Sequence, residues 1–164
     1  MHRSLGTISL ALGLLLEGLV GSCVPIDGGA VEVSWVVHAN GRAITDCSCS
    51  DPEIAAVRID IVGKGGTIEG TTPCAGRDQC KFSCGRQTGA TPFDIPPTHG
   101  NEMYAISVVP VGKDGRDLPA VRTPAPILRT VVEGQPTEVE AFLLEAGCAT
   151  ACEGMNKSGV CARP

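Results

Sequence analysis

Aromatic residues are scarce in this 164-residue chain: one Trp, one Tyr and three Phe make up 3% of it. Stacked aromatic rings form the platforms on which many proteins bind sugars and nucleobases. The scarcity argues against a platform of that kind. It also predicts a modest core of Val, Ile, Leu and Ala, and a small core often needs covalent support.

Clusters of positive charge are also missing. The net charge is −5, from 13 basic and 18 acidic residues, and no run of Lys or Arg occurs. Nucleic acids and anionic membrane surfaces are bound through clustered positive charge. We therefore expect no nucleic-acid partner.

The sequence contains none of the motifs that mark common catalytic sites. There is no Gly-x-Ser-x-Gly elbow around which His38 or His99 would complete a triad. Asp114 and Asp117, on either side of Gly115, are more typical of a hairpin turn than of a calcium loop. We predict a protein that is not an enzyme and has no cofactor or metal site.

The longest apolar run, residues 8–16 (ISLALGLLL), is too short to span a bilayer as a helix. A short N-terminal region with His2 and Arg3 precedes this run, and a segment with small residues follows it and ends at Ser22. This arrangement is typical of a secretory signal peptide. We predict that residues 1–22 are removed on export.

Residues 20–23 (VGSC) resemble the lipobox of bacterial lipoproteins. The resemblance implies that the Cys23 thiol carries diacylglycerol, that the chain is cut before Cys23, and that residues 23–28 form a short lipidated leader. Val24, in place of Asp, implies an outer-membrane destination. An ordinary signal peptidase would also accept Val20 and Ser22, and it would cut the same bond without adding a lipid.

The nine cysteines of the chain become an even set once Cys23 is set aside. Eight cysteines can pair completely in an oxidising compartment. We therefore predict disulfides at Cys47, Cys49, Cys74, Cys80, Cys84, Cys148, Cys152 and Cys161. The sequence does not determine the pairing. Proximity in the sequence favours bridges from 47/49 to the 74–84 group and one bridge from Cys148 or Cys152 to Cys161.

A thiol-based metal or redox protein of the envelope is the alternative. Cys80-x3-Cys84 and Cys148-x3-Cys152 have the spacing of metal ligands on a helix, and Cys47-x-Cys49 is a weak redox motif. Both roles require reduced cysteines, which an exported protein rarely keeps.

Short strands separated by Gly, Pro and Asn-Gly signals dominate the rest of the chain. The clearest is 29–37, where alternation places Val31, Val33, Trp35 and Val37 on one face. Strands are expected at 29–37, 56–62, 81–84, 93–96, 104–111, 127–132 and 136–146.

The segment 136–146 fits two patterns. Strand alternation turns Val139, Ala141 and Leu143 inward, whereas helical spacing groups Val139 with Phe142, Leu143 and Ala146. Because the segment follows a strand and a short turn at 133–135, we predict a strand paired in a hairpin.

About seven such strands predict an all-β fold, an antiparallel β-sandwich over residues 29–146 with an irregular cysteine-containing tail at 147–164. The chain resembles transthyretin-like or carboxypeptidase-regulatory domains in four features. These are the Val-x-Val-x-Trp opening, the strand near residues 103–106, the Asp-Gly pair at 114–115 and the turn at 131–137. The resemblance implies a scaffold rather than an activity. We expect an exported, lipid-anchored, non-catalytic envelope protein that contacts the membrane through Cys23 and binds an unidentified protein or glycan.

Overall fold

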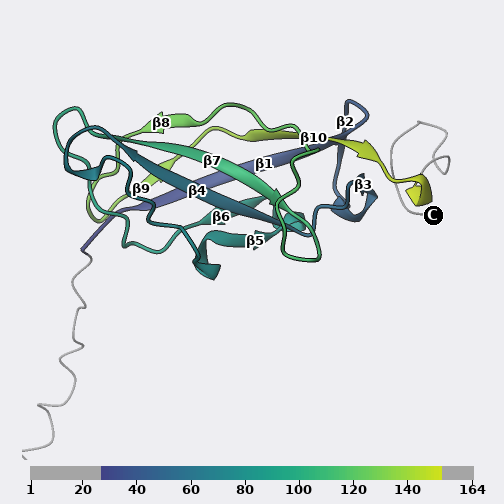
Figure 1. The fold of residues 1–164 in the computed structure, drawn as a ribbon, viewed down its shortest axis with the longest axis horizontal. Coiled ribbons are helices and arrows are strands. Elements are labelled where there is room, and N and C mark those ends of the chain that lie inside the picture. The colour runs from purple at the N-terminus through teal and green to yellow at the C-terminus, as the bar shows by residue number, and fades with distance from the viewer. Residues whose placement is uncertain (1–26, 153–164) are drawn as a thin grey trace, which may run out of the picture.

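One long strand, β1 (Ala30–Ala39), organises the first of two packed sheets in the computed structural model, which describes residues 27–152. Figure 1 shows both sheets running along the length of the molecule. The first half of β1 pairs with β6 and β9, and the second half with β2 and β10. The partners are β2 (Arg42–Ile44), β6 (Thr88–Ala90), β9 (Pro136–Glu138) and β10 (Phe142–Cys148), and β3 (Ser50–Asp51) pairs with β10.

The second sheet is antiparallel, in the order β5-β4-β7-β8. Its strands are β4 (Ala56–Lys64), β5 (Lys81–Ser83), β7 (Met103–Val111) and β8 (Ile127–Arg129). Short 3-10 turns lie in the connections: η1 (Cys47–Cys49), η2 (Gly66–Ile68), η3 (Asp78–Cys80), η4 (Cys84–Arg86) and η5 (Thr150–Cys152). The fold is all-β and disulfide-rich, as the sequence predicts.

The core lies between the sheets and uses the residues that alternation selects. The inward residues of β1 predicted above are at most 3% exposed, and Val57, Ile59 and Ile61 of β4 are buried as well. Tyr104 and Ile106 of β7 complete this layer with no exposed surface. Period-two alternation therefore identifies the buried face of β1 correctly.

The Asn-Gly signal after β1 forms the expected turn. Asn40 and Gly41 both have positive φ, 49° and 77°, and they link β1 directly to the antiparallel β2. Positive φ at both central residues matches the right-handed twist of a hairpin, and Asn-Gly tolerates it best.

The strand partners differ from the antiparallel arrangement that we expected. β1 runs parallel to β9 and to β10, and the described chain forms ten strands rather than about seven. Alternation fixes which face of a strand is buried, but it carries no signal for the direction of the neighbouring strand. β8 belongs to the second sheet and β9 to the first, so the hairpin expected around 133–135 is instead a crossover between sheets.

The segment 136–146 is extended, as predicted, but its inward face is different. Strand structure stops after Glu138 and resumes at Phe142. This break shifts the alternation, so that Phe142 and Leu144 are buried while Leu143 is 39% exposed. The prediction that Ala141 and Leu143 point inward is therefore wrong, although Val139 is buried.

Two further expectations are corrected at strand ends. Residues 93–96 form a single bridge, between Ile95 and Gly29, because the flanking prolines at 92 and 96 have no N–H to donate. β10 continues through Cys148 and pairs with β3, so the sheet extends past the expected boundary at 146. The predicted signal peptide, most of the leader and tail residues 153–164 lie outside the described residues.

Candidate functional site

Three disulfides hold the connections of the sandwich in place. Cys47–Cys84 joins η1 to η4, and Cys49–Cys152 joins η1 to η5, so two neighbouring bridges leave the same 3-10 turn. Cys74–Cys80 closes a small loop before β5. All six cysteines are at most 6% exposed. Buried bridges of this kind act as structural staples, since a thiol from solution cannot reach the sulfur atoms.

The disulfide pairing agrees only in part with the bridges that we predicted from proximity in the sequence. Cys47–Cys84 is a bridge of the expected type, from the 47/49 pair to the 74–84 group. Cys152 pairs with Cys49 rather than within the tail, because the chain after β10 returns to η1. Cys148 is also disulfide-bonded. Cys23 and Cys161 lie outside the described residues.

The geometry separates the cysteines of the suspected metal-ligand motifs. Cys80 and Cys84 belong to different bridges, and so do Cys148 and Cys152. A metal-binding or redox-active cysteine must be a thiolate, and a disulfide sulfur is not one. Within residues 27–152, no three His, Cys, Asp or Glu side chains are grouped as a metal site requires. The same residues contain no helix long and apolar enough to cross a membrane.

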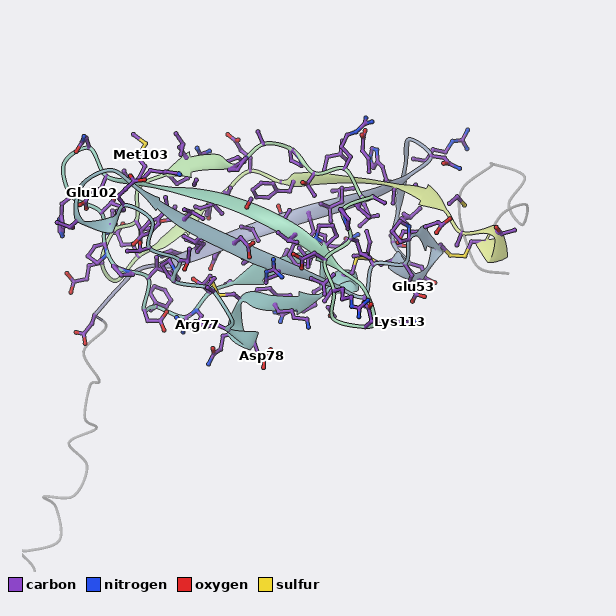
Figure 2. The ribbon with its side chains drawn as sticks, viewed as in Figure 1. Glu53, Arg77, Asp78, Glu102, Met103 and Lys113 are labelled. Atoms are coloured by element: carbon purple, nitrogen blue, oxygen red, sulfur yellow. A yellow bond between two sulfur atoms is a disulfide. The ribbon has the colours of Figure 1, made fainter. Side chains whose placement is uncertain are left out.

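A shallow charged cleft of about 410 Å³ lies on the outer face of the second sheet. Its floor is β4, with Arg58, Asp60 and Val62, and its wall is the loop closed by Cys74–Cys80. Figure 2 shows two residues of that loop, Arg77 and Asp78, projecting from the lower edge of the molecule. The cleft therefore combines a rigid sheet face with a loop fixed by a disulfide.

The two arginines of this cleft already have carboxylate partners. Arg58 Nε lies 2.7 Å from Asp60 Oδ1, and its Nη1 lies 2.7 Å from Asp117 Oδ1. The hydrogen bonds that Arg58 donates to Asp60 and then to Asp117 raise the pKa of Arg58, and the bonds to Asp117 lower the pKa of that carboxyl. Arg77 is paired with Asp94, whose hydrogen bond raises the pKa of the Arg77 guanidinium. The two arginine charges are thus matched internally, while Lys81 and Asp78 of the lining add one charge of each sign. The cleft therefore has no excess of positive charge with which to capture a strong anion.

A second shallow cleft, of about 440 Å³, lies on the outer face of the first sheet. Glu32 of β1 and Glu138 of β9 stand opposite each other in register there, and both are exposed. Arg86 forms part of the lining, with its guanidinium carbon 5.4 Å from the centre of the Phe82 ring. Both clefts are thus open, and charged, polar and apolar groups line them together.

Glu102 is a buried carboxylate that no sequence pattern indicates. It is 4% exposed and lies immediately before β7. Its Oε2 accepts a 2.9 Å hydrogen bond from the His99 backbone N–H, and its Oε1 accepts from the Thr67 N–H and hydroxyl at 2.6 and 2.9 Å. These bonds lower the pKa of Glu102, the His99 bond most of all. Glu102 therefore holds η2 against the loop before β7.

The histidines considered as catalytic candidates do not meet. His38 lies near the end of β1, opposite Ala43 and Glu145, whereas His99 lies in the loop before β7, at the end of the sandwich where β1 begins. Asp114 accepts a hydrogen bond from the Arg116 backbone N–H, as expected of a turn residue. Figure 2 shows Glu102 at one end of the molecule and Lys113, beside Asp114, near the other.

The comparisons with known proteins are negative: no protein-family model, curated protein or solved structure matches this chain.

Proposed function

We propose that this protein is an exported, lipid-anchored, non-catalytic envelope protein whose disulfide-stapled β-sandwich acts as a binding or structural module. In this proposal residues 1–22 are the signal peptide and 23–28 the lipidated leader, and the destination is the outer membrane. The observation that carries the proposal is the use of cysteine. Every cysteine in the described part of the chain is disulfide-bonded, which indicates an oxidising compartment.

Cysteine parity then supports a different chemistry for Cys23. Six cysteines form three bridges and Cys148 is bonded too, so Cys148 needs a partner among the two that remain. Cys161 is much the nearer of the two in sequence. We infer a Cys148–Cys161 bridge, which leaves Cys23 outside the disulfide set and available for lipid.

The proposed anchor has sufficient strength. Diacylglycerol and an N-acyl group together supply three chains, and each buried methylene contributes about 0.8 kcal/mol. A single acyl chain gives only marginal, reversible membrane binding, whereas more than one chain anchors stably.

The shape of the two clefts favours a large polar partner over a small apolar ligand. Small-molecule sites are usually concave and predominantly apolar. Here both clefts are open, and charged residues such as Arg58, Asp60, Glu32 and Glu138 interrupt their apolar lining. A protein or glycan that lies across a rigid sheet face fits these surfaces, and a transthyretin-like scaffold is suited to presenting them.

Intact-mass spectrometry of protein extracted from membranes tests the proposal. We expect the mass of a chain that starts at Cys23, increased by diacylglycerol and one acyl group and reduced by eight hydrogens for four disulfides. A Cys23→Ala variant is the control and should lack the lipid mass. A wild-type chain that begins at Cys23 without lipid would overturn the anchor, and free thiols with bound zinc would favour the metal-binding alternative.

A further inference from the structure

The described chain enters the sandwich at one end, between two loops. Gly29 exchanges backbone hydrogen bonds with Ile95, at 2.9 and 3.1 Å, and the Gly134 N–H donates to the Gly28 carbonyl. A Cβ on Gly29 would overlap Val131 and the Val132 carbonyl, so only glycine fits this passage. Gly28 and Gly29 are therefore fixed between the 93–95 and 131–135 segments.

The tether between this point and the proposed lipid is short. Only residues 24–26 separate Cys23 from Asp27, where the described chain begins. A fully extended chain covers at most about 3.6 Å per residue, so the lipid-bearing residue lies within about 15 Å of Asp27. An anchored protein would hold this end of the sandwich close to the bilayer.

The same end carries most of the large exposed apolar side chains. Phe93 is 42% exposed, Met103 39%, Leu128 52% and Val132 50%. Phe93 and Val132 belong to the two segments that enclose Gly28 and Gly29, Met103 opens β7 opposite Lys64, and Leu128 lies opposite Ala105 on the neighbouring β8. Figure 2 places Met103 at the end of the molecule where β1 begins in Figure 1. The remaining large exposed apolar residue of the described chain, Leu143, lies further along, on β10.

Charge at this end offers little attraction to an anionic membrane. Lys64, opposite Met103, is an exposed cation here, but it is not part of a cluster of positive charge. Arg77 is paired with Asp94 and Arg129 with Glu140. Glu133 adds an exposed acidic group in the turn beside Val132. Contact with lipid would therefore depend on apolar side chains entering the interface rather than on binding anionic headgroups.

We propose that Phe93, Met103, Leu128 and Val132, which we call the apolar end, rest against the lipid surface in which Cys23 is anchored. This inference rests on the lipid anchor proposed above. Large apolar side chains exposed at one end of the molecule indicate an interaction surface there, and the short tether places the bilayer within reach of this end. The opposite end, with the Asn40-Gly41 turn, η1 and Lys113, then faces away from the membrane. The bridges Cys47–Cys84 and Cys49–Cys152 staple the loops of this outward end.

Tryptophan quenching in brominated vesicles tests the orientation. Phe93→Trp places a reporter at the apolar end, and Lys113→Trp places one at the opposite end, where the side chain is 71% exposed. Trp35 is buried and contributes the same background to both variants. The lipidated proteins are reconstituted in zwitterionic phosphatidylcholine vesicles whose acyl chains carry bromine, and the intact mass of each sample confirms the lipid. We expect emission from the Phe93→Trp variant to fall at least about twofold more than emission from the Lys113→Trp variant, and 1 M salt to leave the difference unchanged.

A second pair of variants isolates the apolar contribution. In the Phe93→Trp background, Val132→Ser should reduce the quenching by about half or more, while the matched Leu143→Ser change should leave it unaltered. Equal quenching at positions 93 and 113 in protein that carries the lipid mass would overturn this orientation and leave the proposed anchor intact. Protein without the lipid mass would overturn the anchor and, with it, this orientation.

Discussion

The indole Nε1 of Trp35 donates a 2.9 Å hydrogen bond to the backbone carbonyl of Cys84, a residue 49 positions away. Trp35 lies on β1 and is 1% exposed, while Cys84 opens η4 after β5 and is disulfide-bonded to Cys47. One side chain thus connects the first sheet, the edge of the second sheet and a disulfide. The large core residue and the covalent staple form a single unit.

Replacing Trp35 with Phe should destabilise the protein by about 2–4 kcal/mol. The substitution removes part of a buried ring and the indole hydrogen bond, which leaves the Cys84 carbonyl with only its 3.2 Å bond from the Gln87 N–H. A lost hydrogen bond costs about 0.5–1.5 kcal/mol, and the lost packing adds to it. Urea unfolding of the lipid-free mature chain measures the change. Phe93→Leu at an exposed site is the control and should change stability by less than about 0.5 kcal/mol. A loss below about 0.5 kcal/mol in Trp35→Phe would contradict this role for the indole.

The disulfides should differ in their contributions in the order of the loops that they close. Cys49–Cys152 spans 103 positions, Cys47–Cys84 spans 37 and Cys74–Cys80 spans 6. Loop-closure entropy predicts contributions of about 5, 4 and 2 kcal/mol, respectively. Double Cys→Ala variants of each bridge, unfolded in urea, test the order. If removal of Cys74–Cys80 proves the most costly, native-state contacts rather than chain entropy determine these contributions.

The buried faces of the long strands are predictable from the sequence because their alternation is unbroken. Val31, Val33 and Trp35 on β1, like Ile59 and Ile61 on β4, are flanked by polar or smaller residues at every second position. A half-buried strand requires this period of two, so the pattern and the burial have one cause.

What the sequence does not reveal depends on contacts between distant segments. The parallel pairing of β1 with β10 has no local signal, and the irregular residues 139–141 shift the alternation before Phe142. The bridge between Cys49 and Cys152 depends on where the end of β10 returns in space. In the sequence Glu102 resembles any other loop carboxylate, since its donors come from the Thr67 and His99 segments.

Glu102→Gln should weaken the protein most near neutral pH. The hydrogen bonds from His99 and Thr67 lower the pKa of Glu102 from its ordinary value of 4.5. A lowered folded-state pKa means that the carboxylate stabilises the fold above about pH 4.5 and loses this contribution as the pH falls through the folded-state pKa. The difference in unfolding free energy between wild type and Glu102→Gln should therefore be largest at pH 7 and shrink at pH 3.5.

Urea unfolding at the two pH values measures this difference. Glu133→Gln is the matched control, because Glu133 is exposed in a turn. It should leave stability nearly unchanged at both pH values. A Glu102→Gln difference that is the same at pH 7 and pH 3.5 would show that shape, rather than the ionised carboxylate, accounts for the effect.

Arg58→Gln should raise the pKa of Asp117 toward its ordinary value of 3.8, because Arg58 supplies the hydrogen bonds that lower it. The stability cost should stay below about 1 kcal/mol, since the Asp117 side chain is 53% exposed and water screens the pair. NMR titration of the carboxyl carbons measures the pKa directly, with Asp114 as an internal control. Arg58→Lys keeps the charge but lacks the planar fork that reaches both Asp60 and Asp117, so it should give an intermediate pKa for Asp117. An unchanged Asp117 pKa in Arg58→Gln would mean that this guanidinium does not set the charge balance of the cleft.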